Sequence, residues 1–256
     1  MKSPSAARRV AYLSYGLLCY TMFLGVFLYA IGFIGNFLVP TTLDSPRLGS
    51  LWSALVINGI LLGVFALQHT GMARPTFKNW WTKIVPTPIE RSTYVLFSNV
   101  AMILLFVLWQ PMGGQVWNIE NTALRSIVYG LFGLGWALVL YSTFLINHFD
   151  LFGLRQVWLY FRNKPYTNLK FRVPSLYRYV RHPLYVGWLI VFWAAPTMTV
   201  AHLLFAVGTT GYILIAIQFE ERNLVDSLPG YKEYRSRTPM LIPSLTKSKS
   251  ETQIAG

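Results

Sequence analysis

The chain of 256 residues is 54% hydrophobic and only 12% charged, whereas a soluble domain carries about 25% charged residues. Apolar stretches of about 20 residues, the length that a helix needs to cross a bilayer, recur along it. This composition excludes an ordinary soluble protein. It predicts an all-α fold, a polytopic integral membrane bundle of five to six transmembrane helices.

The net charge of +13 follows membrane topology rather than nucleic-acid binding. Of the 22 Lys and Arg residues, 20 lie in the N-terminal tail, in residues 73–92, in residues 150–182 and after residue 220. Loops rich in Lys and Arg stay on the cytoplasmic side of a membrane. We therefore expect both termini in the cytoplasm, with the bilayer and no nucleic acid as a partner.

Four long apolar segments precede a shorter apolar hairpin. The four segments cover about 11–35, 51–71, 92–110 and 124–147. The glycines of YGLFGLGW (129–136) lie in the middle of the fourth segment, where they allow a neighbouring helix to approach closely. A glycine-rich nucleotide loop is rejected, because it would need a turn between a strand and a helix.

The hairpin consists of residues 184–195 and 200–219 around a turn at Pro196 to Thr199. Its first arm has about 12 residues before Pro196, or roughly 18 Å of helix, and the bilayer core is ~30 Å thick. We expect a shortened or re-entrant span. Residues 1–243 form one predicted domain, with no confident strand, and residues 244–256 form a predicted disordered tail.

Metal and disulfide chemistry find no support in the residue pattern. The single cysteine, Cys19, lies in the first apolar stretch and has no second cysteine with which to pair. Four scattered histidines and one cysteine give no ligand spacing for a metal ion. We predict no metal site.

Residues 177–243 carry two polar clusters around the hairpin. In RHPLYVG (181–187), His182 precedes a proline and is therefore pushed out of helical geometry. Proline is favoured at the first position of a helix, so Pro183 is predicted to begin one. The free N–H groups of that first turn, beside Arg181 and His182, form a candidate site for a carboxylate or phosphate. The alternative is a simple interfacial cap.

The second cluster begins at FEERNLV (219–225), where two carboxylates end an apolar span. Such charges are costly at a membrane unless they are solvated or paired. Either the helix simply leaves the membrane, with Arg222 neutralising part of the charge, or one carboxylate of Glu220 and Glu221 faces inward. An inward carboxylate would bind a cationic or hydroxyl-bearing ligand.

The closing segment GYKEYRSRTPMLIP (230–243) combines tyrosines with an apolar run. Tyr231 and Tyr234 are three residues apart and share a face of a helix, and tyrosine faces bind cations. The run TPMLIP (238–243) is able to fold back as a lid. One cluster thus suits an anion and the other a cation with hydroxyls, the groups carried together by S-adenosylmethionine.

The three motifs, in this order and around a membrane hairpin, closely resemble the C-terminal signature of the isoprenylcysteine carboxyl methyltransferase superfamily. They cover about 65 residues. Three upstream segments are similar to a bacterial branch, the methanethiol S-methyltransferases, also called NnrU-like proteins. These segments are LQHTGMARPTF (67–77), ERSTYVLFSN (90–99) and LINHFDLFGLRQVWLY (145–160).

The resemblance implies an S-adenosyl-L-methionine-dependent thiol S-methyltransferase of a bacterial inner membrane, with its active site facing the cytoplasm. Methanethiol would be the acceptor, giving dimethyl sulfide and S-adenosylhomocysteine. Carried over position by position, the cofactor-binding residues are Arg181, His182, Pro183, Tyr185, Gly187, Glu220, Glu221, Tyr231, Tyr234, Arg237 and Pro239.

A thiol acceptor requires a base, because the thiolate and not the thiol is the nucleophile. His148 is the first candidate base, with Asp150 as its orienting group and Arg155 as a thiolate stabiliser. His69 is the second candidate, whereas His202 is expected to be structural. A small aromatic acceptor pocket is expected from Phe149, Phe152, Trp158 and Tyr160.

Several alternatives remain open at this stage. A prenylated cysteine or phospholipid amine as acceptor would need a wide gap open to the bilayer. A reductase with a related membrane fold would need space to bind a nicotinamide dinucleotide, and the short loops of this chain provide little. A non-enzymatic accessory or transport protein is disfavoured, because intramembrane charges mark transporters and here the charges gather at span ends. The oligomeric state is left open.

Overall fold

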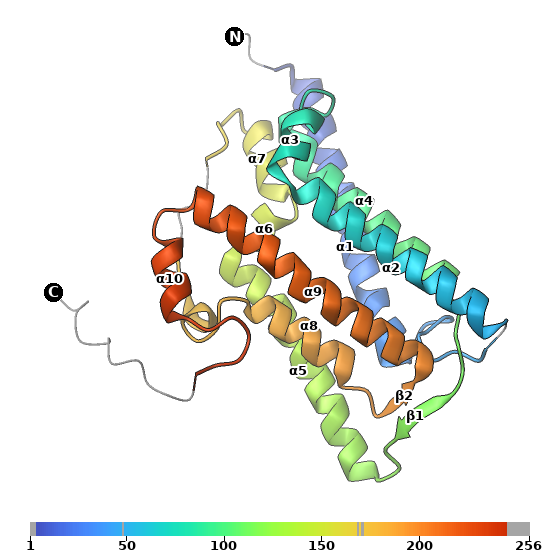
Figure 1. Cartoon of the computed structure of the whole chain (residues 1–256). Helices are drawn as coiled ribbons and strands as arrows, with labels where there is room; N and C mark the ends of the chain where they lie inside the picture. The colour runs from blue at the N-terminus through green and yellow to red at the C-terminus, as the bar shows by residue number, and fades with distance from the viewer. Residues whose placement is uncertain (1–3, 48, 168, 170–171, 245–256) are drawn as a thin grey trace.

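The computed structural model describes residues 4–47, 49–167, 169 and 172–244, so nearly all of the predicted disordered tail lies outside the described residues. Among them are five helices long and apolar enough to cross a membrane. The predicted all-α membrane bundle is therefore confirmed (Figure 1). The five helices are α1 (Ala6–Gly35), α2 (Leu51–Ala73), α4 (Thr87–Leu108), α5 (Thr122–Ile146) and α9 (Val200–Ser227).

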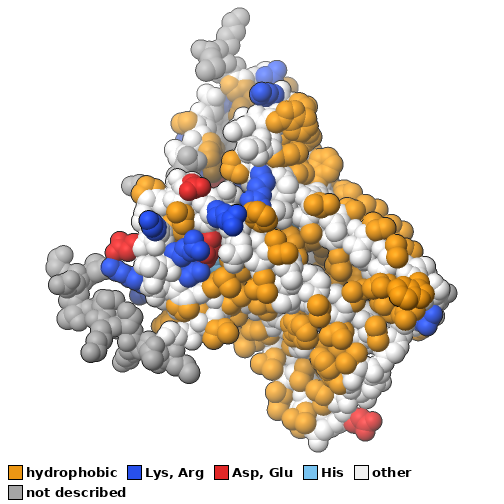
Figure 2. Space-filling view, viewed as in Figure 1, with side chains coloured by type: hydrophobic (Ala, Val, Ile, Leu, Met, Phe, Trp, Pro, Cys, Tyr) orange, Lys and Arg blue, Asp and Glu red, His pale blue; other side chains and the backbone are white. Residues whose placement is uncertain are grey.

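Short helices gather where α1 begins and α9 ends (Figure 1), and we call this the basic end. At this end, Arg9 near the start of α1 donates a hydrogen bond to the carbonyl of Phe161, the last residue of α7. Apolar side chains cover much of the bundle's flank in Figure 2, while most of the visible charge lies at this end. The cytoplasmic location of this end stays a prediction. Its short helices are α3 (Pro75–Trp81), α6 (His148–Leu151), α7 (Leu154–Phe161), η1 (Ser175–Arg178) and α10 (Tyr231–Arg237).

The first arm of the hairpin is short, as expected. Helix α8 (Pro183–Trp193) has 11 residues and is followed by strand β2 (Thr197–Thr199). This strand pairs antiparallel with β1 (Gln115–Asn118), at what we call the strand end. Sequence reasoning did not predict the pair, because segments of three and four residues are too short to show alternation. The pairing supplies hydrogen-bond partners to backbone N–H and C=O groups just outside the ends of α8 and α9.

Helix α8 lies against α5 through two glycines. A Cβ at Gly187 would stand 2.8 Å from the backbone nitrogen of Val139, and one at Gly135 would stand 3.0 Å from that of Val191. Any side chain at these positions would therefore push the helices apart. Close approach through the glycine-rich run of α5 is thereby confirmed at Gly135.

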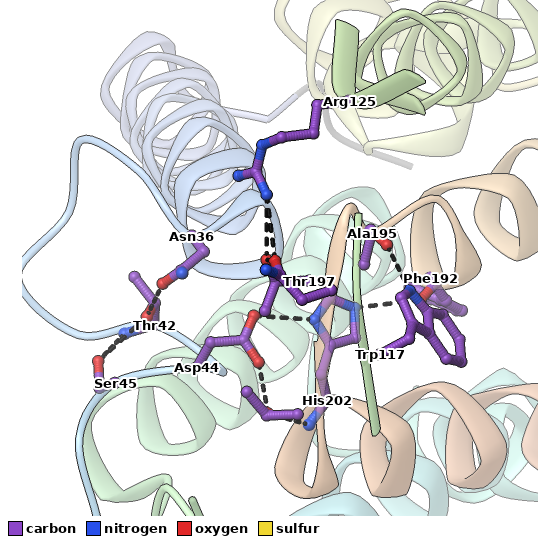
Figure 3. Close-up of polar contacts among 12 residues, drawn as sticks. Asn36, Thr42, Asp44, Ser45, Trp117, Arg125, Phe192, Ala195, Thr197 and His202 are labelled. Atoms are coloured by element: carbon purple, nitrogen blue, oxygen red, sulfur yellow. Dashed lines mark hydrogen bonds and ion pairs between the residues drawn. The ribbon is translucent and has the colours of Figure 1, made fainter. Parts of the chain in front are cut away.

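A buried polar cluster closes the strand end (Figure 3). His202 lies 3.1 Å from a carboxylate oxygen of Asp44 through Nδ1 and 3.1 Å from the carbonyl of Phe192 through Nε2. Thr199 donates to the same carboxylate. These contacts join the loop after α1 to the start of α9. His202 is 19 residues before Glu221 on α9, or about 28 Å along the helix axis, so it lies far from the basic end.

Candidate active site

The turn before α8 is built as the sequence indicated. Pro183 is the first residue of the helix, and His182 takes non-helical geometry before it. The N–H of Arg181 donates to the carbonyl of Pro239 at 2.9 Å, and that of His182 donates to Met240 at 3.2 Å. The apolar run after α10 therefore folds back against the start of α8.

Glu221 is the centre of a buried ion-pair network. Its side chain is 2% exposed, accepts a hydrogen bond from Arg181 Nε at 2.6 Å and forms an ion pair with Arg235 Nε at 3.0 Å. His182 Nε2 lies 3.0 Å from the same carboxylate. Arg181 also donates to the carbonyls of Arg235 and Thr238. The network joins the end of α9 to the start of α8 and to α10.

The neighbouring carboxylate of Glu220 has different surroundings. Its side chain is exposed and accepts a hydrogen bond from Tyr185 at 2.9 Å. The two adjacent carboxylates therefore differ: Glu221 is buried in the ion-pair network, and Glu220 is exposed to solvent.

The tyrosines of the closing segment lie beside this network. The hydroxyl of Tyr234 donates to the carbonyl of Tyr177 at 2.6 Å, and its ring lies 5.7 Å from that of the buried Tyr231. Burial raises the pKa of Tyr234 to about 12 and raises the pKa of Tyr177 and Tyr231 as well. These phenols therefore remain protonated hydrogen-bond donors at neutral pH.

Three predicted cofactor residues lie elsewhere or act through the backbone. Gly187 faces α5 at the close contact described above. The exposed side chain of Arg237 pairs with Glu233 at 2.6 Å on the outer face of α10. Pro239 contributes its carbonyl to Arg181. None of these contacts points toward the Glu220 carboxylate.

His148 is buried with both ring nitrogens engaged. The hydroxyl of Thr143 donates to the carbonyl of Leu140, so its oxygen accepts from His148 Nδ1 at 2.8 Å. His148 Nε2 then accepts from the hydroxyl of Tyr20 at 2.7 Å. Burial lowers the pKa of His148. These contacts describe a neutral imidazole whose hydrogen-bonding capacity is filled within the protein.

Asp150 and Arg155 lie close to His148 in sequence but are bonded to other groups. Arg155 pairs with Asp150 at 2.9 Å and also donates to Thr167. The hydroxyl of Tyr166 donates to the second oxygen of Asp150 at 3.3 Å. Asp150 thus orients the loop after α7, whereas Tyr20 and Thr143 orient His148.

The four aromatic residues of the expected acceptor pocket have different neighbours. Phe149 and Phe152 both lie against the His148 ring, at 5.5 Å and 4.8 Å between ring centroids, and Phe152 also stacks on Phe23 of α1 at 3.9 Å. Tyr160 stacks on Tyr12 at 5.1 Å, and Trp158 is about half exposed. An acceptor pocket formed by all four stays a prediction.

His69 of α2 has different surroundings from His148. Ser98 donates its hydroxyl to the carbonyl of Tyr94, so its oxygen accepts from His69 Nδ1 at 3.2 Å. The Tyr94 hydroxyl lies 3.0 Å from both ring nitrogens. The ring of Phe65 stacks on the imidazole at 5.2 Å. This assignment puts the lone pair of His69 on Nε2, where the Tyr94 hydroxyl contacts it.

Tyr94 and Tyr212 are the site residues that sequence reasoning missed. Tyr94 contacts His69, and Tyr212 accepts from Thr70 at 3.1 Å, the next residue of α2. Tyr94 and Ser98 are four residues apart and so share one face of α4. That spacing is a local signal for Tyr94, whereas Tyr212 lies on α9 and has no such signal.

Comparisons with known proteins find relatives that cover most of the chain. No family model matches the chain, and no solved structure matches it. Methanethiol S-methyltransferase of Crocosphaera subtropica is 58% identical over 96% of each chain. The protein of that name from Mycobacterium tuberculosis is 52% identical over 92% of this chain and 97% of its own. The Nurim homolog of Drosophila pseudoobscura pseudoobscura is 27% identical over 71% of this chain and 74% of its own.

Identity above half over nearly the whole length of both chains extends far beyond the C-terminal motifs. It includes the segments of α2 and α4 that hold His69 and Tyr94. The chain belongs to the methanethiol S-methyltransferase family.

Proposed function

We propose that this membrane protein transfers a methyl group from S-adenosyl-L-methionine to the sulfur of methanethiol, giving dimethyl sulfide. The observation that carries the proposal is the contact between the ends of α2 and α9. Thr70 donates to the hydroxyl of Tyr212 at 3.1 Å, and the guanidinium of Arg74 lies 4.1 Å from the centroid of the Phe219 ring. Thr70 follows His69 and Phe219 precedes Glu220, so a base for the thiol and a carboxylate for the donor lie on neighbouring helix ends. The relatives' names supply the acceptor.

The residues present fit S-adenosylmethionine. The exposed Glu220 carboxylate offers an acceptor for an ammonium or for ribose hydroxyls. Tyr185 is the one side chain within the described residues that donates to it, so acceptor capacity remains. Glu221, Arg181 and His182 hold the helix ends that surround Glu220. When bound, this cofactor supplies a methyl group on a sulfonium centre.

His69 accepts the thiol proton at Nε2 in this proposal. Ser98 fixes the tautomer by accepting from Nδ1, and the stacked Phe65 ring fixes the plane of the imidazole. The thiol sulfur then forms the new carbon–sulfur bond as the donor's sulfonium–methyl bond breaks. Alignment and exclusion of water contribute most of the remaining rate enhancement. The half-buried rings of Tyr94 and Tyr212 supply that enclosure.

The basic end is proposed to face the cytoplasm, where S-adenosylmethionine is available. Arg74 and Lys78 lie between α2 and α4 at this end, Arg91 lies near the start of α4, and Arg235 lies on α10. Such a concentration of basic residues is typical of the cytoplasmic side of a membrane protein.

Two matched substitutions test the assignment of the base. His69→Ala is expected to lower turnover by 10²–10⁴-fold, the range for a lost general base, while binding of S-adenosylmethionine to the detergent-purified protein stays within about threefold of wild type. His148→Ala is expected to change stability more than turnover. A loss of turnover on His148→Ala alone, with stability unchanged, would transfer the role to His148.

A titration with S-adenosylmethionine tests the proposal independently of the base. Saturable binding to wild type, weakened in Glu220→Gln, is expected. Absence of binding to a folded wild-type protein would favour an accessory or transport role instead.

A further inference from the structure

A cavity with several charged and polar lining residues lies at the basic end, between α3, the start of α4 and α7. Its volume is about 340 Å³, large enough for a small polar group of a dozen or so atoms. Lys78 and Asn79 line it from α3, Arg91 from α4, and Gln156 from α7. None of the proposed cofactor or base residues lines this cavity.

The charges around the cavity are mixed, with a positive excess. Glu90 is buried and pairs with Lys78 at 3.6 Å. Arg91 and Lys164 add two further positive charges to the lining. Thr87 and Pro88, the first residues of α4, also line it, and no side chain caps the first turn of that 22-residue helix. An uncapped helix start adds partial positive charge.

Two buried polar atoms in the residues that line the cavity have no hydrogen-bond partner among the described residues. They are the Nε of Arg91, a donor, and the Oε1 of Gln156, an acceptor. Burial of an unsatisfied polar group costs free energy comparable to a lost hydrogen bond. A ligand that satisfies both must carry an acceptor for Arg91 and a donor for Gln156.

The cavity lies at the depth of the lipid headgroups. Helix α3 begins two residues after the apolar helix α2 ends and carries Phe77, Trp80 and Trp81. Trp80 is 51% exposed, and Ile84 just after the helix is 62% exposed. Tryptophan side chains that remain exposed beside a membrane span favour the headgroup region.

We propose that this cavity binds the headgroup of a membrane phospholipid. The phosphate accepts from Arg91 and interacts with Lys164, and the ammonium or hydroxyl beyond the phosphate donates to Gln156. Both phosphatidylethanolamine and phosphatidylglycerol carry this combination of groups. A bound headgroup holds α3, α4 and α7 together where the spans leave the bilayer.

Full-length protein purified in mild detergent and stripped of lipid provides the test. Thermal unfolding and native mass spectrometry are recorded with short-chain phosphatidylglycerol, short-chain phosphatidylethanolamine, glycerol phosphate or diacylglycerol. We expect retention and stabilisation with both phospholipids and none with diacylglycerol. An equal effect of glycerol phosphate and phospholipid would identify a free anion as the ligand and overturn the lipid assignment.

Variants localise the effect to the cavity. The double substitution Gln156→Leu with Lys164→Ala is expected to weaken phospholipid retention about tenfold or more. The control is Lys83→Ala, an exposed lysine that lies just after α3 and does not line the cavity. Equal retention by wild type, the double variant and the control would overturn the proposal, as would loss in the control. Correct folding of the double variant is checked by its binding of S-adenosylhomocysteine.

Discussion

Replacing Glu221 by Gln removes the carboxylate at the centre of the network that joins α8, α9 and α10. The side chains of Arg181 and His182 are 11% and 5% exposed, so little water reaches them to compensate. Loss of one partner from a buried ion pair costs about 3–5 kcal/mol. Arg235 is 44% exposed, and its pairing adds little to that figure.

The stability loss converts into a measurable shift. For a chain of this size, 1 kcal/mol lowers Tm by about 2–4 °C, so Glu221→Gln should lower Tm by roughly 6–20 °C. Thermal unfolding of the purified protein in one detergent, followed by intrinsic tryptophan fluorescence, gives the value. Binding of S-adenosylmethionine to this variant should also fall, because Arg181 and the folded-back segment lose their anchor.

Glu220→Gln is the matched control, one residue away on the same helix. Because Glu220 is exposed and its amide replacement still accepts from Tyr185, Tm should change by less than about 2 °C. Cofactor binding should weaken about tenfold, since a charge-assisted hydrogen bond becomes a neutral one. Equal Tm values for the two variants would refute the division of roles between the adjacent carboxylates.

Three further substitutions test separate parts of the structure. Gly187→Ala places a Cβ 2.8 Å from the Val139 backbone nitrogen, so it should cost about 1–3 kcal/mol, measured by thermal unfolding; unchanged Tm would contradict the packing. Burial lowers the pKa of His148, so the unfolded chain binds the extra proton below about pH 6.5. Wild-type stability should therefore fall between pH 7 and pH 5, and His148→Gln should flatten that dependence, whereas an unaltered slope would contradict it. Asp44→Asn breaks the contact with His202 and should lower Tm. Turnover per folded molecule should stay unchanged, because the strand end lies about 28 Å from Glu221. Loss of turnover at unchanged Tm would contradict a structural role for Asp44.

Local chemistry made the start of α8 predictable. The ring of Pro183 fixes its φ and excludes helical geometry at His182, whatever surrounds them. The membrane spans were predictable for a similar reason, because bilayer thickness sets helix length. The shortness of α8 followed directly from the position of Pro196.

The roles of Glu220 and Glu221 depend on tertiary packing and were not predictable. Adjacent residues on a helix point about 100° apart, and only the positions of α8 and α10 determine which carboxylate is enclosed. Sequence reasoning expected one of the two carboxylates to face inward without deciding which, and the family resemblance assigned both to the cofactor pocket. The structure separates an internal network at Glu221 from an accessible carboxylate at Glu220.

The choice between His69 and His148 also required three-dimensional contacts. Both histidines follow polar residues at the end of an apolar span, so their sequence surroundings are alike. What distinguishes them is the arrangement of their partners. Thr143 and Tyr20 each bond one nitrogen of His148, whereas Ser98 contacts Nδ1 of His69 and the Tyr94 hydroxyl lies at an equal 3.0 Å from both of its nitrogens. These partners lie up to 128 residues away in the chain, beyond the reach of any local pattern.

The most direct measurement supplies the purified protein with methanethiol and S-adenosylmethionine labelled at the methyl carbon, and analyses the headspace gas by mass spectrometry. Dimethyl sulfide with one labelled methyl group is predicted from wild type, with far less from the His69→Ala and Glu220→Gln variants. Unlabelled dimethyl sulfide, or none from a folded protein that binds the donor, would contradict methyl transfer at this site.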